Sequence, residues 1–592
     1  MRKDESILTD RQTDRQTDRQ TGELTGFPSI DKPWLKYYSE EAINAPLPEC
    51  SIYEYMLENN KDYPADIAIN YLGRKITYKE LFENIDKTAS AFIKAGVKEK
   101  EIVTVALPSI PEALYCVYAL NKIGAVANMI HPLAGKEETL NYLNEVKSRV
   151  AVIFDGAYTT IADDIEKTSV EQVIVASPSD SLPLALKIAY NLKVKKPQLN
   201  GKFIGWKDFI QAGQGIAAKD VKKDCHEMAI ISHTGGTTGE PKGVTCSDYN
   251  VNALIYQIIQ NFKYRRQETC IVVLPPFVNY SLVESMMAML YIGFKVVLIP
   301  KYDPLKLCEY IAKFRPYVIF SIPAYWEILL RIDTNGCDMS SLRYGIYGGE
   351  AMSKETEVAV NDLLKKCGAK GILLKGLGST EMVAAATSTY EGQNSVGSAG
   401  VPLVRVNCKV VAPKTTDELE YGIEGEICFS GPTLMLGYYD NHEATDEVIK
   451  VHDDGVRWLH TGDLGYINED GVIFVTGRIK RIIMTKGNDG QVTKLFPDRI
   501  EKAIYSNPAV ELCCVIGIPD EARINYPKAF IVLKDGTIQN EDVRLSILND
   551  CKELLPDYMI PEEIEFRTDL PRTSRGKVDY RALEQEIDNI TP

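Results

Sequence analysis

Residues 228–243 read MAIISHTGGTTGEPKG, an apolar run followed at once by a loop of glycine, threonine and one lysine. Because glycine has no Cβ, such a loop lets the backbone approach a bulky anion. The hydroxyls of Thr234, Thr237 and Thr238 can donate to phosphate oxygens, and Lys242 supplies positive charge. The letters differ from the G-x-x-x-x-G-K-[ST] pattern, so a P-loop fold does not follow. Taken alone, the segment fits a phosphate-binding loop and a flexible surface loop equally well.

Short apolar runs alternate with helical patterns on both sides of this loop. Between residues 28 and 156 the runs include EIVTVALP and VAVIFDG, and Thr77 with Glu80 has the spacing of a helix capping box. The alternation recurs between Met228 and Leu374. This pattern predicts parallel sheets flanked by helices. We therefore expect an α/β protein with two lobes of similar build, one from each stretch.

The downstream third of the chain changes character. From Gly397 to Val475 the apolar runs shorten and Gly and Pro become frequent, which predicts a small β unit. After Arg478, mixed helix and strand patterns predict a compact α+β domain. A single core rarely grows past about 250–300 residues. We therefore predict a large N-terminal domain over 28–479, made of the two lobes and the β unit, and a smaller C-terminal domain over 480–592.

Two segments stand apart from these domains. Residues 1–27 contain three TDRQ repeats and almost no apolar side chains, which predicts a disordered, low-complexity tail. Residues 181–197 read SLPLALKIAYNLKVKKP, a leucine-rich amphipathic pattern with lysines near its end. This segment fits either a weak membrane-surface contact or a surface helix packed on its own lobe, and we favour the packed helix.

Composition excludes several classes of protein. A net charge of -15 argues against nucleic acid as a partner, because phosphate backbones require a basic face. The 13 cysteines are scattered without a C-x-x-C pair, which is typical of reduced thiols in a cytoplasmic protein. No apolar run reaches the roughly 18 residues of a membrane helix. His233 lies beside the Gly/Thr loop, where we expect it to pack rather than to catalyse.

Four further motifs carry polar groups at predicted strand ends or loops. Residues 376–381 (GLGSTE) follow the apolar run ILLK, at the kind of strand end where α/β sheets bind ligands. Their lone carboxylate suits Mg²⁺ beside phosphate. Residues 458–463 (WLHTGD) end with an acid placed to accept from ribose hydroxyls. Residues 477–481 (GRIKR) lie at the predicted domain junction, and 571–577 (PRTSRGK) set a lysine in a loop. Singly, each also fits a turn, a cap or a solvated charge run.

Together and in this order, the blocks resemble the adenylate-forming (AMP-binding) superfamily of acyl-CoA synthetases, luciferases and peptide-synthetase adenylation domains. The resemblance covers residues 28–583. It implies that the protein activates a carboxylic acid with ATP as acyl-AMP, releases pyrophosphate and transfers the acyl group to the thiol of coenzyme A. Mg²⁺ is the implied metal, and the C-terminal domain is implied to be mobile.

The resemblance also implies roles for individual residues. Gly348, Gly349 and Glu350 match the segment that packs against adenine, and Thr380 and Glu381 match phosphate and Mg²⁺ contacts. Lys577 matches the lysine that bridges the carboxylate and the α-phosphate, and Lys480 matches the hinge. The full set implied to bind ATP or AMP is Thr234, Gly236, Thr237, Thr238, Gly239, Lys242, Gly348, Gly349, Glu350, Gly378, Asp463 and Arg478, with Asp463 and Arg478 at the ribose.

Three departures from the family pattern concern the acyl and thiol sites. Leu377 replaces the usual aromatic residue of G-Y-G-x-T-E. Residues 275–279 (PPFVN) lack the histidine of many acyl-CoA ligases, so its gating role is absent or moved to Asn279. Residues 487–497 lengthen the loop near the hinge, which bears on coenzyme A binding.

The choice of acid and acceptor stays open at this point. Val278 stands where an amino-acid-activating domain needs a buried acid, so we expect an apolar acid, most simply a fatty acid. The alternatives are an aromatic or sterol-type acid, a carrier protein as thiol acceptor, and a non-enzymatic adenylate-binding regulator. Retention of Lys577 argues against the regulator, because a pure binder does not need that lysine.

Overall fold

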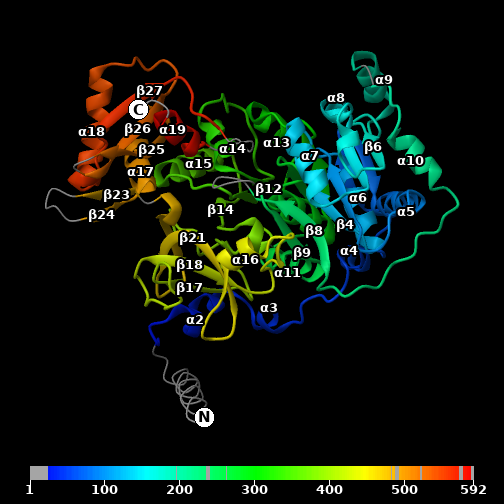
Figure 1. Cartoon of the computed structure of the whole chain (residues 1–592), viewed down its shortest axis with the longest axis horizontal. Coiled ribbons are helices and arrows are strands. Elements are labelled where there is room, and N and C mark those ends of the chain that lie inside the picture. The colour runs from blue at the N-terminus through cyan, green and yellow to red at the C-terminus, as the bar shows by residue number, and fades with distance from the viewer. Residues whose placement is uncertain are drawn as a thin grey trace, which may run out of the picture.

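The computed structural model describes residues 24–194, 197–234, 241–261, 263–481, 483–486, 492–520, 523–572 and 578–588. Two large sheets, a small β unit and a separate C-terminal domain make up the molecule (Figure 1). The predicted tail lies almost wholly outside the described residues. Its last residues are part of the body, since Tyr421 N donates to Gly26 O over 3.1 Å.

The first large sheet has eight strands in the order β19-β9-β8-β4-β3-β5-β6-β7. Strands β8, β4, β3, β5, β6 and β7 are parallel, and β9 and β19 add an antiparallel edge. The bounds are β3 (Ile102–Ala106), β4 (Val126–Met129), β5 (Val150–Phe154), β6 (Gln172–Ala176), β7 (Phe203–Gly205), β8 (Met228–His233), β9 (Gly243–Ser247) and β19 (Gly437–Tyr438).

The second large sheet has seven strands in the order β14-β13-β12-β10-β11-β1-β2, all parallel except β2. Their bounds are β1 (Ile67–Tyr71), β2 (Arg74–Thr77), β10 (Thr269–Val272), β11 (Lys295–Leu298), β12 (Val318–Ser321), β13 (Tyr344–Tyr347) and β14 (Leu373–Lys375).

The two lobes are confirmed, but our assignment of chain segments to them is wrong. The early hairpin β1–β2 joins the second sheet beside β11, whereas β8 and β9 complete the first sheet beside β4. The reason is that an apolar run reports that a strand is buried, not which sheet receives it. Strand β8 is buried over five of its six residues and fits the interior of either sheet.

Helices shared by the two sheets form the centre of the molecule. One buried cluster contains side chains from both sheets and from α5, α6 and α11. All twelve residues of α6 are buried, as expected for a helix that is covered all round. Separate clusters cover the outer faces, with α13 and α15 on the seven-stranded sheet and α7 on the eight-stranded sheet. The bounds are α5 (Tyr78–Lys94), α6 (Pro111–Lys122), α7 (Lys136–Glu145), α11 (Asp248–Ile259), α13 (Leu307–Phe314) and α15 (Lys354–Lys366).

The predicted β unit is present between the lobes and the C-terminal domain. Its main sheet runs β17-β18-β21-β20, with β22 also paired to β21. The bounds are β17 (Asn407–Val411), β18 (Gly425–Ser430), β20 (Ile449–Val451), β21 (Arg457–Ile467) and β22 (Ile473–Arg478). The long strand β21 carries the whole WLHTGD motif, so the motif belongs to this unit.

The C-terminal domain has its own buried clusters and a three-stranded sheet, β25-β26-β27. The loop that the sequence shows as lengthened ends in strand β24, which pairs with β23. An ion pair of 2.8 Å between Arg331 and Glu511 joins the domain to the second lobe. The bounds are β23 (Ile483–Lys486), β24 (Val492–Leu495), α17 (Pro497–Tyr505), β25 (Val510–Asp520), β26 (Ile524–Leu533), α18 (Glu541–Leu554), β27 (Glu563–Arg567) and α19 (Tyr580–Asp588).

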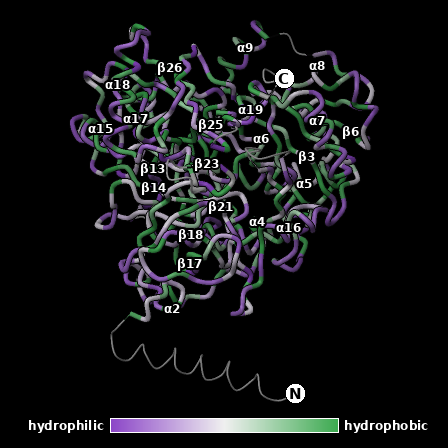
Figure 2. The backbone as a smooth tube through the Cα atoms, turned by 60° about the vertical axis from the view of Figure 1, so that its left-hand side comes forward, coloured by the Kyte–Doolittle hydropathy of each residue, from purple (hydrophilic) through white to green (hydrophobic). Residues whose placement is uncertain are grey.

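One helix departs from the packing that we expected. Helix α9 (Leu184–Lys193) has no buried residue, so the interpretation of segment 181–197 as a helix packed on its lobe is wrong for most of its surface. Figure 2 shows α9 at the edge of the molecule. No helix in the described part of the chain is both long enough and apolar enough to span a bilayer.

Candidate active site

Two of the predicted nucleotide-binding segments follow directly after two neighbouring strands of the second sheet. Strands β13 and β14 are parallel, with Tyr347 opposite Lys375 in the register. Gly348 follows the first strand and Gly376 follows the second, and a Cβ on Gly348 would lie 3.7 Å from the Gly376 carbonyl oxygen. Glu350 is exposed. The predicted adenine segment and the GLGSTE motif therefore share one edge of the seven-stranded sheet.

A buried ion pair lies directly beneath these two segments. The Lys375 ammonium contacts the Glu357 carboxylate of α15, and both side chains are almost fully buried. Tyr347 Oη donates to Glu357 Oε2 over 3.3 Å, and the Gly397 amide donates to the same oxygen over 3.3 Å. Burial lowers the pKa of Lys375, against the pull of Glu357. The pair ties β13, β14, α15 and the start of the β unit together.

Residues 381–385 fold back sharply after the motif. Val383 has φ 62° and ψ −58°, and the Ala384 amide donates to Met382 O over 2.7 Å. This geometry is a γ-turn of the rare, strained form, here centred on a fully buried β-branched residue. Gly378 must lack a side chain, because a Cβ there would lie 1.9 Å from Ala384 O. The turn thus holds strain next to Thr380 and Glu381.

Tyr438 contacts both Glu381, the residue predicted to bind magnesium, and Lys242 at the end of the Gly/Thr loop. Tyr438 Oη donates to Glu381 Oε1 over 2.7 Å, and Lys242 Nζ lies 5.0 Å from the Tyr438 ring centroid. The Met435 amide also donates to Glu381 O over 2.8 Å. A cation and a carboxylate from distant parts of the chain therefore lie around one aromatic ring. No sequence pattern marks Tyr438, which is one of 32 tyrosines.

The two ends of the Gly/Thr loop are held together. The Thr234 amide donates to Lys242 O over 2.9 Å, and the Lys242 amide donates to Thr234 Oγ1 over 3.0 Å. These bonds continue the antiparallel pairing of β8 and β9 by one step beyond His233 and Gly243. The other predicted loop residues, Gly236, Thr237, Thr238 and Gly239, lie outside the described residues.

The two predicted ribose residues contact each other across the β unit. Asp463 on β21 lies opposite Arg478 on β22, and Arg478 Nε is 2.8 Å from Asp463 Oδ1. Asp463 is buried, while about half of the Arg478 side chain is exposed. The structure therefore brings both together, and the carboxylate is held in place by the arginine.

A histidine network supports the turn before Asp463. His460 Nδ1 is 2.9 Å from Glu426 Oε2, and the Gly462 amide donates to Glu426 Oε1 over 3.0 Å. His460 Nε2 is 2.9 Å from His452 Nε2. Burial, with the nearby charge of Lys409, lowers the pKa of His452 to about 4, so this ring is neutral at neutral pH. Glu426 thus holds both the histidine and the backbone of the TGD turn.

The segments around the hinge position bind one helix of the C-terminal domain. The Arg478 amide donates to Asp498 Oδ2 over 3.0 Å, and Arg481 contacts both Asp498 and Glu501 on α17 at 2.6 Å. Lys480 lies between these contacts, in a short 3₁₀ turn over Ile479–Arg481. The side chain of Lys480 and all of Lys577 lie outside the described residues. A β-bridge joins Arg572 to Val578, the two described residues on either side of the segment that contains Lys577.

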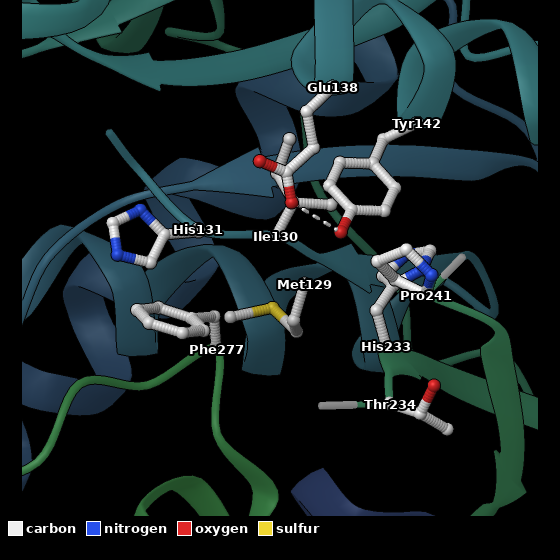
Figure 3. Close-up of a pocket in the computed structure, with 9 residues that line it drawn as sticks. All are labelled: Met129, Ile130, His131, Glu138, Tyr142, His233, Thr234, Pro241 and Phe277. Carbon is white, nitrogen blue, oxygen red and sulfur yellow. Dashed lines mark hydrogen bonds between the residues drawn. The ribbon is translucent and has the colours of Figure 1, made fainter. Parts of the chain in front are cut away.

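A small hollow opens beside the described ends of the Gly/Thr loop (Figure 3). Its lining includes Thr234 and His233, with Tyr142 Oη donating to Glu138 Oε1 over 2.9 Å. The buried His233 ring packs 4.2 Å from the Tyr142 ring and has Nε2 2.8 Å from Asn128 Oδ1. His233 is therefore a packed, hydrogen-bonded residue, as we expected.

The segment that replaces the family histidine has a structural contact. Asn279 is buried and its Oδ1 accepts from Ser232 Oγ on β8 over 2.5 Å. This bond links the first sheet to the π-helix over Tyr280–Met287, which follows PPFVN. Glu284 in that helix is buried, and burial raises its pKa to about 8, so this carboxyl is neutral at neutral pH. The gating role stays a prediction, and the amide of Asn279 is engaged between the lobes.

Comparison with known proteins agrees with this arrangement. A family model described as AMP-binding enzyme matches residues 56–439, and one described as AMP-binding enzyme C-terminal domain matches residues 499–577. A long-chain-fatty-acid–CoA ligase of Bacillus subtilis is 27% identical, over 94% of this chain and 99% of its own length. A probable 4-coumarate–CoA ligase of Dictyostelium discoideum is 30% identical, over 93% of this chain and 97% of its own length.

Solved structures share the fold. The anthranilate CoA ligase AuaEII in complex with anthranoyl-AMP superposes with a TM-score of 0.77 at 22% identity, covering 92% of this chain and 98% of that one. ATP-bound MatB from Rhodopseudomonas palustris has a TM-score of 0.78 at 23% identity, covering 91% and 100%. These likenesses confirm the large N-terminal and smaller C-terminal architecture.

The buried pair beneath the site gives a stability prediction. Lys375→Met leaves the Glu357 carboxylate buried without its cation, and we expect a loss of about 3–5 kcal/mol in unfolding free energy. The double variant Lys375→Met with Glu357→Leu removes both charges and should recover much of that loss. Urea unfolding measures the natural chain, the single variants Lys375→Met and Glu357→Leu, and the double variant. A double variant as unstable as the sum of the two single variants would contradict the role of charge.

The γ-turn gives a second prediction. At ordinary positions glycine is about 0.5–1 kcal/mol less favourable than alanine. At Val383 the order should reverse, with Val383→Gly more stable than Val383→Ala by about 1 kcal/mol, because only glycine adopts positive φ without strain. Both variants remove the buried side chain, so the difference reports the backbone alone. Greater stability of the alanine variant would show that the turn is not strained.

Proposed function

This chain belongs to the family of AMP-binding enzymes, and from that premise we propose that it is an ATP-dependent acid–thiol ligase. In this proposal the enzyme converts an apolar carboxylic acid, most simply a fatty acid, into acyl-AMP and then into the coenzyme A thioester. The proposal is supported by two relatives that are named as CoA ligases. The match extends over nearly the whole length of each relative.

One observation carries the proposal furthest. Lys242, Tyr438 and Glu381 lie together at the described end of the Gly/Thr loop, although almost two hundred residues separate Lys242 from Tyr438. A polyphosphate needs positive charge and backbone donors, and its magnesium needs a carboxylate. This cluster offers the side chains at one place, beside the strand ends that carry the predicted adenine segment.

The residues present fit a magnesium ion. Mg²⁺ usually takes one or two protein carboxylates and completes its shell with water and phosphate oxygens. Glu381 meets that description, since Tyr438 occupies one of its two oxygens and the carboxylate lies next to Thr380. When bound, the ion would offset negative charge on the phosphates. Tyr438 would then orient the carboxylate.

The proposed chemistry has two steps. A carboxylate oxygen of the acid attacks the α-phosphorus of ATP, a new P–O bond forms, and the bond to pyrophosphate breaks. The thiol sulfur then attacks the acyl carbon, AMP leaves with both bonding electrons, and the thiol proton passes to solvent. The first step brings an anion to a polyanion, so the enzyme must offset repulsion and align the reactants. We assign that role to Lys242, to the loop donors and to Lys577.

We further propose that the chain divides functionally at residues 479 and 480. Lys577 would act in the first step and leave the site when the C-terminal domain swings about Lys480. The contacts on both sides of Lys480 support this division, because Arg478 and Arg481 both bind Asp498 while Arg478 also holds Asp463 of the large domain. A swing would have to break the hydrogen bond from the Arg478 amide to Asp498, because Arg478 lies on the large-domain side of the division.

The acid is proposed from two residues that depart from the family pattern, Val278 and Leu377. Val278 is part-buried against the central core and offers no charge for a substrate ammonium group. Leu377, in place of an aromatic residue, is likewise packed on that core, and its amide donates to Thr387 Oγ1 over 2.7 Å. These features favour an apolar acid. The relatives named for fatty acids and for 4-coumarate make both classes necessary in the test.

The test is pyrophosphate release from Mg²⁺-ATP across fatty, aromatic, sterol-type and amino acids, with and without coenzyme A. We expect release that requires a fatty acid and is accelerated by coenzyme A. Lys577→Ala should reduce release at least about a hundredfold, since it removes charge from the transition state. Lys414→Ala, at an exposed lysine outside the predicted motifs, serves as the lysine control.

Each other outcome points elsewhere. Release that needs an acid but is not accelerated by coenzyme A would indicate that a carrier protein, and not coenzyme A, is the thiol acceptor. Release with aromatic acids alone would overturn the fatty-acid assignment. No acid-dependent release from any member of the panel would contradict the ligase proposal itself.

A further inference from the structure

Helix α9 presents an apolar stripe that the rest of the described chain leaves uncovered. Leu184, Ile188 and Leu192 recur at every fourth residue, so they lie along one face of the helix. Their side chains are 75%, 54% and 84% exposed. Large apolar side chains scattered singly are ordinary on a protein surface, but a contiguous row on one helix is typical of an interaction site.

The orientation of α9 is set by its opposite face. Tyr190 is part-buried and packs against the central core cluster, and Leu182, just before the helix, is buried. Ser181 Oγ also donates to the buried carboxylate of Glu112 over 2.6 Å, which anchors the chain at the helix start. The apolar stripe therefore faces away from the body, and Figure 1 shows α9 at the outer end of the first lobe.

The charge along the sequence segment that contains α9 is opposite to that of the whole protein. Lysines occur at 187, 193, 195, 196, 202 and 207, and the sequence from Ser181 to Lys207 contains neither aspartate nor glutamate. The complete chain carries a net charge of -15. An anionic lipid surface offers negative headgroups to these lysines and an apolar layer to the stripe at the same place.

We propose that α9 docks the enzyme on an anionic lipid bilayer, with Leu184, Ile188 and Leu192 inserted at the level of the headgroups. The helix is ten residues long and lies on the surface without spanning it. Lysines beside the stripe contact the negative headgroups, and the acidic remainder of the protein stays away from them. The proposal does not depend on the chemistry of the active site.

Co-sedimentation of the full-length enzyme with vesicles tests the proposal. We expect binding to vesicles of phosphatidylcholine mixed with phosphatidylserine, and weaker binding to phosphatidylcholine alone. The triple variant Leu184→Ser, Ile188→Ser, Leu192→Ser should lose at least about tenfold in partitioning, because apolar insertion and charge act together. Binding should also fall when salt is raised from about 0.1 M to about 1 M, which shortens the Debye length from about 10 to 3 Å.

A matched control separates the stripe from surface hydrophobicity in general. Leu305, Val451 and Ile538 are 61%, 66% and 76% exposed at three separate places in the chain. Their triple serine variant should bind vesicles like the natural chain. Both triple variants should keep the melting temperature and the pyrophosphate release of the natural chain in solution, since none of these side chains is buried or lies in the proposed site.

Three outcomes would overturn the proposal. The natural chain could fail to sediment with anionic vesicles, or the α9 variant could bind as well as the natural chain. Sedimentation velocity could also show a dimer that the α9 variant loses, which would assign the stripe to self-association. None of these results would bear on the ligase activity, which is measured without lipid.

Discussion

The buried contact between Lys375 and Glu357 is the constraint on which the proposed site depends. It joins the last strand of the seven-stranded sheet to the helix that covers its outer face, and Glu357 also accepts from Tyr347 and from the Gly397 amide. A charge buried without its partner is costly, so these elements hold their relative positions tightly. The segments that follow Tyr347 and Lys375 therefore leave the sheet in a fixed relation, and the predicted adenine and phosphate contacts lie along one edge.

The second constraint is the way that the two lobes share their interior. Helices α5, α6 and α11 share one buried cluster with side chains of both sheets, and Asn279 bonds to Ser232 across the boundary. Lys242 follows a strand of the first sheet, whereas Glu381 follows a strand of the second. Tyr438, on the edge strand β19, contacts both. The shared core fixes the distance between the sheets. Within the described part of the chain, the cluster of Lys242, Tyr438 and Glu381 is therefore held in place without contacts from the C-terminal domain.

Several features of the fold could be predicted because they depend on local sequence. The capping box of Thr77 and Glu80 is present at the start of α5, and the strand-loop patterns around residues 228–243 and 373–381 occur as expected. Sheet membership could not be predicted, because the hairpin over residues 67–77 carries no mark of its partner β11. The same holds for site residues joined by tertiary contacts. Tyr438, Glu357, Glu426 and Asp498 lie in stretches without a motif, and only their neighbours in space reveal a role. The exposure of α9 was likewise hidden, since an amphipathic pattern does not show whether its apolar face is covered.

The central claim is that a carboxylate oxygen of the substrate becomes bonded to the α-phosphorus of ATP. The most direct test supplies a fatty acid labelled with ¹⁸O in both carboxylate oxygens, together with Mg²⁺-ATP and coenzyme A, and analyses the products by mass spectrometry. Our account predicts AMP that carries one ¹⁸O atom and a thioester that retains the other. Unlabelled AMP, or label in inorganic phosphate beside ADP, would contradict an acyl-adenylate intermediate.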